Sequence, residues 1–309
     1  MGEEKITDRS TAEMALPGFV ISAEEAAGMA AERGAAAVEE LLPALVPAAM
    51  RRARAPISRF PVGAVGLGSS GRVYVGVNLE FPGLPLHHSV HAEQFLVANA
   101  AAAGEAGIRC IAVSHMPCGH CRQFLQELRA APEIRILVTS DGPAAAFRPL
   151  SALLPRPFGP PDLLHKDVPL LLEPHDNDLG PAAIAAAEDG VEGAADERLR
   201  AAAEAAARAA YAPYSGCAAG FAVADAAGRV HAGAYAESAA YNPSLGPVQA
   251  AMVAMTAAEA EAEAEVAAAA LVEKEGAAVS HEATARIFLA AVAPRAHLRV
   301  YRFRPSDQA

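Results

Sequence analysis

The chain has 309 residues, of which 53% are hydrophobic and 20% charged, and this length corresponds to about two domains. Its formal net charge of −11 would repel phosphate groups, which argues against nucleic acid or an anionic membrane as the main partner. No stretch reaches the ~18 apolar residues of a membrane span, the acidic N-terminus does not resemble a signal peptide, and four cysteines are few for a disulfide-stabilised secreted domain. We therefore expect a cytoplasmic protein.

The first elements that the sequence predicts are helices. Residues 1–20 are interpreted as a flexible leader. Ser22 and Glu25 fit a capping box, in which the two side chains pair with free backbone amides at a helix start. Ala-rich helices are expected to follow over roughly 23–33 and 35–50.

Strands and helices then alternate. Two β-rich runs, 61–67 and 73–77, flank a glycine-bearing turn and predict a hairpin. A helix is predicted over 91–103, a buried strand over 108–113 and a further strand over 134–138. This order predicts an α/β fold, a three-layer α/β/α sandwich.

Two short stretches carry the residue types of a zinc site. His91-Ala92-Glu93 lies in the first turn of one predicted helix, and Pro117-Cys118-Gly119-His120-Cys121 opens the next. Cys118 and Cys121 are three residues apart, so they share one helix face, and a helix N-terminus favours their thiolate form. With His91 they supply three corners of a zinc tetrahedron and leave the fourth for water.

The reaction follows from these residue types. Zinc lowers the pKa of a bound water from ~15.7 toward ~7. Glu93 could reach that water and carry protons to the substrate, whose target would be an electron-poor amidine carbon that loses ammonia. Cys-x-x-Cys alone would also fit a redox pair, or a structural zinc site completed by Cys110, His115 or His120.

The second half of the chain repeats the first. At a fixed offset of 157, Ala55-Pro56-Ile57-Ser58 matches Ala212-Pro213-Tyr214-Ser215, and Gly71-Arg72-Val73 matches Gly228-Arg229-Val230. We infer a duplicated domain. The equivalent of the His-Ala-Glu stretch falls near Pro247-Val248-Gln249, allowing a one-residue slip, and no Cys-x-x-Cys follows. The second copy is therefore expected to keep the fold without a metal site.

The domain limits follow from this repeat. We predict a catalytic zinc domain over 21–145, a Pro- and Gly-rich linker over 146–190 and a non-catalytic repeat domain over 191–309. Within the repeat domain, the Ala/Glu-rich segment 257–270 is interpreted as a solvated helical insertion or flexible segment. Residues 287–290 and 298–303 are predicted to be the last strands.

The first half resembles the cytidine deaminases in their two-domain, homodimeric form. The matching stretches are Phe60-Pro61-Val62-Gly63-Ala64, Asn78-Leu79-Glu80-Phe81, His91-Ala92-Glu93-Gln94 and Pro117-Cys118-Gly119-His120-Cys121-Arg122-Gln123-Phe124. Tyr211-Ala212-Pro213-Tyr214-Ser215 and Ala240-Tyr241-Asn242-Pro243-Ser244-Leu245 resemble the degenerate C-terminal domain of that family. The resemblance covers the chain from about residue 20 to the end.

The resemblance implies a role for particular residues. It implies one Zn²⁺ per subunit on His91, Cys118 and Cys121, with Glu93 as the catalytic proton shuttle. It further implies substrate contacts from five residues: Phe60, which stacks on the base, Asn78 and Glu80, which hold the ribose 3′-hydroxyl, and Leu79 and Ala92. Phe158 is a candidate for a second aromatic wall.

The function expected on this basis is hydrolytic deamination of cytidine and deoxycytidine to uridine and deoxyuridine, in pyrimidine salvage. The resemblance also implies a homodimer whose active site is completed across the interface. The alternatives are a polynucleotide cytosine deaminase, which the charge of −11 disfavours, and a non-catalytic relative that binds zinc or nucleosides.

Overall fold

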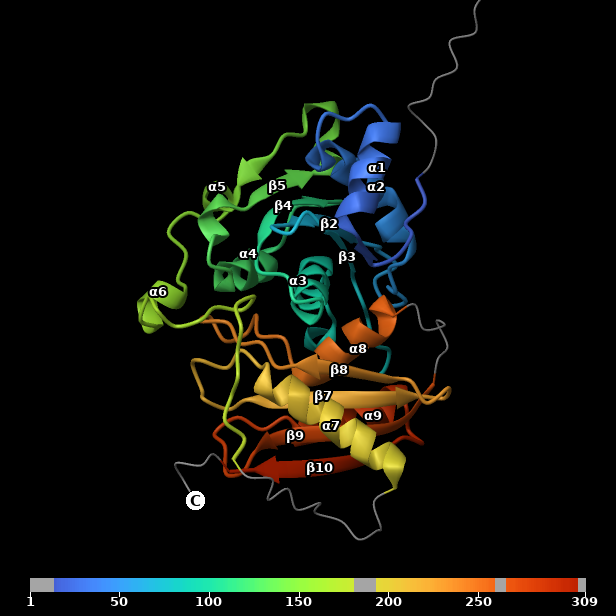
Figure 1. Ribbon diagram of the computed structural model, residues 1–309, viewed down its shortest axis with the longest axis vertical. Helices are drawn as coiled ribbons and strands as arrows, with labels where there is room; N and C mark the ends of the chain where they lie inside the picture. The colour runs from blue at the N-terminus through green and yellow to red at the C-terminus, as the bar shows by residue number, and fades with distance from the viewer. Residues whose placement is uncertain (1–13, 181–192, 259–264, 305–309) are drawn as a thin grey trace, which may run out of the picture.

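The computed structural model describes residues 14–180, 193–258 and 265–304, which form two α/β domains. Figure 1 shows one domain above the other, with α3 and α8 between their sheets. The elements of the first domain are β1 (Val20–Ile21), α1 (Ala23–Glu32), α2 (Val38–Arg51), β2 (Gly63–Gly68), β3 (Val73–Val77), α3 (Ala92–Ala102), β4 (Ile108–Val113), α4 (Gly119–Phe124), β5 (Arg135–Val138) and β6 (Arg148–Pro149). After these come α5 (Leu150–Leu153), α6 (Pro160–Leu163), α7 (Ala194–Arg208), β7 (Ala219–Asp225), β8 (Val230–Ala234), α8 (Pro247–Ala257), β9 (Val266–Lys274), α9 (Glu282–Val292) and β10 (His297–Phe303).

The two sheets share one topology. The first has the order β1-β3-β2-β4-β5-β6 and the second β10-β9-β7-β8, so β3-β2-β4-β5 corresponds to β8-β7-β9-β10. In each, the two hairpin strands are antiparallel and the last pair, β4–β5 or β9–β10, is parallel. Both central strands also carry a register irregularity at the same place, Leu67/Gly68 in β2 and Ala224/Asp225 in β7. The predicted duplication and the predicted hairpin are confirmed.

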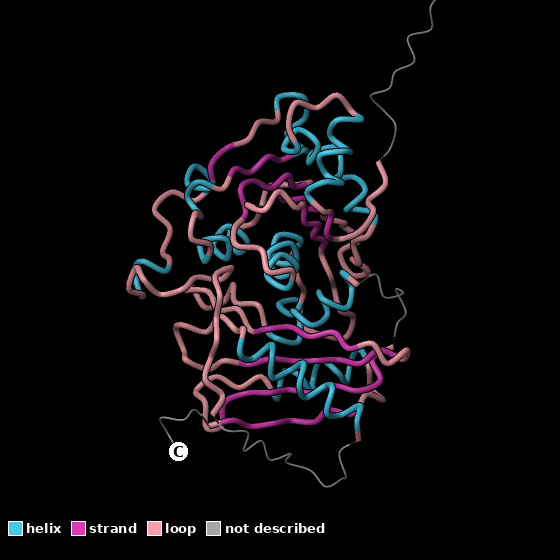
Figure 2. Tube along the Cα trace, in the orientation of Figure 1, coloured by secondary structure: helices cyan, strands magenta, loops and turns pink. Residues whose placement is uncertain are grey.

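Helices cover both faces of each sheet, as the predicted three-layer sandwich requires. A Cβ added to Gly63 would meet α2, whereas one added to Gly76 would meet α3. The second domain has the same close approaches, since Gly220 faces α7 and Gly233 faces α8. Only glycine lets these helices pack so near the strands. Figure 2 shows the two groups of strands separated by helices.

The predicted leader and linker are partly wrong. Leu16 and Phe19 are buried in the first core, and β1 pairs with β3, because these apolar residues cover an otherwise open sheet edge. Residues 1–13 lie outside the described residues. At the other end, β6 pairs with β5, so the first sheet extends past residue 145 into the predicted linker.

Two interpretations in the second domain are also wrong. Residues 287–290 belong to α9 and not to a strand, since Ala285, Phe288 and Leu289 are buried at helical spacing. Part of the Ala/Glu-rich segment 257–270 is β9, a buried central strand whose alanines gave no alternating pattern. Residues 259–264 lie outside the described residues. The strand predicted over 298–303 is confirmed as β10.

The equivalence between the domains shifts by two residues before α8. Isolated bridges link Arg54 to Leu79 and Leu79 to Val90 in the first domain, and Tyr211 to Ala236 and Ala236 to Leu245 in the second. Equivalent positions therefore lie 157 apart up to Leu79 and 155 apart from Val90 onward. The counterpart of His91-Ala92-Glu93 is Gly246-Pro247-Val248, and Gln249 corresponds to Gln94. The sequence-based pairing was one residue too far along because the intervening loop is shorter in the second domain.

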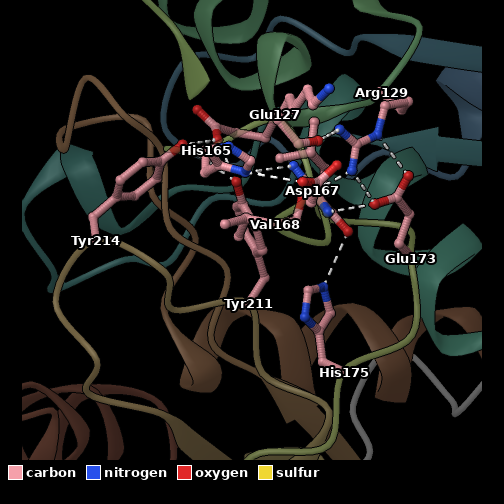
Figure 3. Close-up of polar contacts among 11 residues, drawn as sticks. Glu127, Arg129, His165, Asp167, Val168, Glu173, His175, Tyr211 and Tyr214 are labelled. Atoms are coloured by element: carbon pink, nitrogen blue, oxygen red, sulfur yellow. Dashed lines mark hydrogen bonds and ion pairs between the residues drawn. The ribbon is translucent and has the colours of Figure 1, made fainter. Parts of the chain in front are cut away.

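The domain interface is polar at one end. Glu127 from the first domain is fully buried, and Tyr211 and Tyr214 donate their hydroxyls to it at 2.9 and 2.6 Å (Figure 3). The backbone N–H of Ala239 donates to its other oxygen at 2.8 Å. Burial nevertheless raises the pKa of Glu127. These three donors tie the segment after α4 to two loops of the second domain.

The opposite end of the interface is apolar. Phe81 from the first domain meets Phe288 of α9 with ring centroids 4.7 Å apart. Leu84 of the same loop is buried in the core of the second domain. The two domains are thus joined by a hydrogen-bonded cluster at one end and by aromatic packing at the other.

Candidate metal centre

Three side chains from two helix starts converge on one point. His91 is the N-cap of α3 and Cys118 the N-cap of α4, while Cys121 lies in the first turn of α4. The predicted helix therefore begins at Gly119, two residues after Pro117, because Cys118 has the extended conformation of a cap. The parallel pair β4–β5 and the antiparallel β2 fix where both helices start.

The geometry fits zinc. His91 Nδ1 lies 3.5 Å from Cys118 Sγ and 3.3 Å from Cys121 Sγ. Tetrahedral zinc, with Zn–N near 2.0–2.1 Å and Zn–S near 2.3 Å, needs an N–S separation of about 3.5 Å. Among the described residues, no fourth His, Cys, Asp or Glu joins this group, so neither His115, His120 nor Cys110 closes it. The donor set and its spacing match the three-ligand pattern of a catalytic zinc site.

The two thiols differ in acidity, since the hydrogen bond to Cys118 and burial raise the pKa of Cys121. A hydrogen bond from Cys121 lowers the pKa of Cys118 to about 3, with a further contribution from His91. The helix start also favours a thiolate at this position. Cys118 is exposed and lines the pocket beside the site, whereas Cys121 is buried.

Glu93 lies beside the ligands without being one of them. It is only 4% exposed, and its Oε2 is 3.3 Å from Cys121 Sγ. Burial raises the pKa of Glu93 above the ordinary carboxyl value. A carboxyl group that is drawn toward neutrality in this way can both accept and return a proton near pH 7.

A pocket of about 440 Å³ opens in front of this group. Phe60 is 50% exposed in its wall, and its ring lies 4.6 Å from that of His115. No substrate role was predicted for His115, and its place in the pocket wall became evident only from the fold. The lining residues are Ser58, Phe60, Val62, Asn78, Glu80, Ser89, Val90, His91, Ala92, Glu93, His115, Met116 and Cys118.

The predicted substrate residues are only partly brought together. Phe60, Asn78, Glu80 and Ala92 line the pocket. Leu79 does not line the pocket, because its side chain is buried in the core. Its backbone forms an isolated antiparallel bridge with Val90. Phe158 is 49% exposed outside the lining.

Asn78 and Glu80 also shape the pocket wall. Asn78 accepts from Val62 N at 2.8 Å and donates to Phe60 O at 3.0 Å. Glu80 accepts from the backbone of Ile57 and Ser58. Burial alone would raise the pKa of Glu80, but the hydrogen bonds from Ser58 and Ile57 outweigh it and keep this pKa low. Both side chains therefore hold the loop that carries Phe60.

The fold and the site together define a zinc-dependent deaminase domain that occurs twice in one chain, and among the residues that the structure describes its metal ligands are found only in the first copy. Two family models, both described as the cytidine and deoxycytidylate deaminase zinc-binding region, match residues 37–137 and 150–286. Cytidine deaminase 1 of Arabidopsis thaliana is 50% identical over 296 residues, which cover 92% of this chain and 97% of the relative. The cytidine deaminase of Pectobacterium atrosepticum is 41% identical, over 82% of this chain and 79% of its own. A crystal structure of the Mycobacterium tuberculosis cytidine deaminase matches 39% of this chain and 97% of its own at 33% identity, with a TM-score of 0.35.

The chain belongs to the cytidine and deoxycytidylate deaminase family. Within the described residues, no helix is long and apolar enough to cross a membrane.

Proposed function

We propose that the protein catalyses the hydrolytic deamination of cytidine and deoxycytidine to uridine and deoxyuridine, with release of ammonia. The observation that carries this proposal is the convergence of His91, Cys118 and Cys121, with buried Glu93 beside them, at the base of a nucleoside-sized pocket. Zinc, when bound to these three ligands, supplies the Lewis acidity that makes a water reactive at neutral pH.

Glu93 is the proton carrier in this proposal. Its carboxylate takes a proton from the attacking water and passes it to the ring nitrogen of the base. The resulting hydroxide adds to the ring carbon that bears the amino group. Glu93 then takes the remaining proton of the added hydroxyl and gives it to the amino group, so that the C–N bond breaks, a carbonyl forms, one water is consumed and one ammonia leaves. Its burial keeps this proton exchange away from bulk solvent.

The pocket wall orients the substrate. We assign Phe60 to stacking on the base, since its half-exposed aromatic ring lines the pocket beside that of His115. The side-chain amide of Asn78 uses one N–H and one oxygen lone pair in hydrogen bonds to the backbone. Its second N–H and second lone pair are therefore available to the ribose 3′-hydroxyl. Glu80 is the second proposed contact to that hydroxyl.

A homodimer and a cytoplasmic role in pyrimidine salvage belong to the same proposal. Ile57, Phe60 and Met116 are 45%, 50% and 42% exposed, and Phe60 and Met116 line the pocket. Large apolar side chains at a pocket mouth are the kind of surface that a second subunit covers. The mass in solution tests the dimer, and a monomer at working concentrations would contradict it.

Turnover tests the reaction. The purified protein should remove the ultraviolet absorbance of cytidine and release one ammonia per cytidine consumed. Removal of zinc with a chelator should abolish both signals, and added zinc should restore them. A zinc-loaded protein that binds cytidine without ammonia release would favour a non-catalytic relative.

A further inference from the structure

The two helices at the domain interface make matched glutamine contacts. Gln94 is the third residue of α3, and its Nε2 donates to Pro243 O in the second domain at 2.9 Å. Gln249 is the third residue of α8, and its Nε2 lies 3.4 Å from His88 Nδ1 in the first domain. At the offset of 155 that holds from Val90 onward, Gln94 corresponds to Gln249, and His88 and Pro243 lie in the equivalent loops that end at Val90 and Leu245. Each domain thus reaches into the same loop of the other.

The two glutamines differ in what their oxygens do. Gln94 Oε1 accepts the backbone N–H of His91 at 3.4 Å. Gln249 Oε1 is buried and has no hydrogen-bond partner among the described residues. Of the two glutamines, therefore, only Gln94 holds the N-cap residue of its own helix, which is His91.

The held residue is a metal ligand. His91 is the N-cap of α3, so its backbone N–H lies outside the helix and needs another acceptor. Its Nδ1, the ring nitrogen nearer the backbone, is the atom that faces the two cysteine sulfurs. A displacement of the His91 backbone would therefore move this donor atom directly.

We propose that Gln94 is a positioning residue that couples the second domain to the zinc ligand His91. Gln94 is only 2% exposed, and its amide spans from Pro243 O to His91 N, so the loop before α8 fixes the side chain that holds the backbone of the ligand. The second domain then contributes to the metal site without a ligand of its own. This inference rests on the proposed zinc site.

The test compares Gln94→Met with Gln249→Met in the zinc-loaded full chain. Both variants keep the side-chain volume, and each removes one amide contact between the domains. The measurement is the rate of zinc transfer to a chromogenic chelator. Loss of a group that orients a metal ligand typically weakens metal binding by ~10–100-fold. We expect Gln94→Met to release zinc faster by about that factor, and Gln249→Met to release it at the wild-type rate.

A further variant separates the two contacts of the amide. Gln94→Glu can still accept from His91 N but cannot donate to Pro243 O, so we expect it to release zinc faster as well. With cytidine, Gln94→Met should lower kcat more than it changes KM, because the pocket wall is intact. Equal thermal unfolding of the zinc-free Gln94 and Gln249 variants would show that both remain folded.

Three results would overturn the inference. They are a wild-type release rate in Gln94→Met, the same acceleration in Gln249→Met, and a wild-type rate in Gln94→Glu. A wild-type chain that holds no zinc would instead overturn the proposed function and this inference with it.

Discussion

Two helix starts show how the domains diverged. In the first domain, the N-cap of α3 is His91, and the first turn of this helix brings the buried carboxyl of Glu93 to the pocket. In the second domain, the N-cap of α8 is Gly246, and Gly246 and Val248 stand at the positions that correspond to His91 and Glu93. Neither residue has a side chain that can bind zinc or carry a proton, yet the helix packs on its sheet in the same way. A few side chains at helix starts therefore determine the chemistry, while buried glycines and strands determine the fold.

The two positions that we propose to contact the sugar, Asn78 and Glu80, diverged unequally. Glu80 accepts from the backbone of Ile57 and Ser58, and its counterpart Glu237 accepts in the same way from Tyr214 and Ser215. Asn78 has no such counterpart, since Tyr235 occupies its place and packs against His281 at 4.4 Å. The glutamate is therefore needed by the fold in both domains, whereas the asparagine remains only where a substrate pocket remains.

The largest expected effect concerns Glu93, the proposed proton carrier. Glu93→Gln should lower kcat by ~10²–10⁴-fold, because an amide cannot accept and return a proton. Zinc content should remain that of the wild type, since Glu93 is not among the three ligands. Turnover of cytidine and metal analysis of the same sample measure both quantities. Wild-type activity in this variant would remove Glu93 from the reaction.

The next effect concerns Asn78. Asn78→Ala should lower kcat/KM for cytidine by about 10–100-fold, which corresponds to the ~1–3 kcal/mol of a lost buried hydrogen bond. The wild-type enzyme should discriminate against a cytidine that lacks the 3′-hydroxyl, and the variant should not. Equal discrimination in both proteins would mean that Asn78 only supports the loop around Phe60.

The polar end of the interface offers a test of domain coupling. Tyr214→Phe removes a hydroxyl that donates to the buried carboxylate of Glu127 at 2.6 Å. We expect the free energy of unfolding to fall by about 1.5–3 kcal/mol in urea titrations. Tyr241→Phe is the matched control, because Tyr241 is 69% exposed. Equal stability of the two variants would show that the buried cluster does not hold the domains together.

The smallest effect concerns the hairpin turn of the first domain. Burial would raise the pKa of Glu105, but hydrogen bonds from Ser69, Ser70 and Tyr74 outweigh it and lower this pKa to about 2. Such a carboxylate stabilises the fold above its unfolded pKa of ~4.3, and this stability is lost as the pH falls toward 2. Glu105→Gln should therefore cost about 1–2 kcal/mol at pH 7 and progressively less below about pH 4.

The control for this pH dependence is Glu32→Gln, at an exposed position on α1. Unfolding titrations at several pH values measure both variants. A stability difference for Glu105→Gln that stays constant from pH 7 to pH 3 would contradict the assignment.

The sequence predicted the zinc ligands because their spacing is local: His91 and Glu93 lie in one helical turn, and so do Cys118 and Cys121. The repeat likewise predicted that the second half of the chain keeps the fold of the first, and the shared sheet topology confirms this. The roles of Gln94, Glu127 and His115 could not be predicted, since each depends on contacts between segments distant in the chain. For Gln94 a signal was present, because a glutamine three residues after a helix cap often binds the cap backbone.

The wrong secondary-structure predictions fall in two segments whose composition shows no clear hydrophobic periodicity. The alanines of β9 and the short apolar run in α9 have no pattern that separates strand from helix. The predicted counterpart of the His-Ala-Glu stretch was one residue too far along the chain. The loop before α8 is two residues shorter than its equivalent, and this deletion cannot be recognised in a repeat whose sequence has already diverged.

X-ray absorption spectroscopy of the zinc-loaded protein tests the central claim most directly. The account predicts one zinc per chain with two sulfur ligands, one imidazole nitrogen and a remaining position that exchanges with solvent. A fourth protein ligand that closes the coordination sphere, or a second zinc held by the repeat domain, would contradict it.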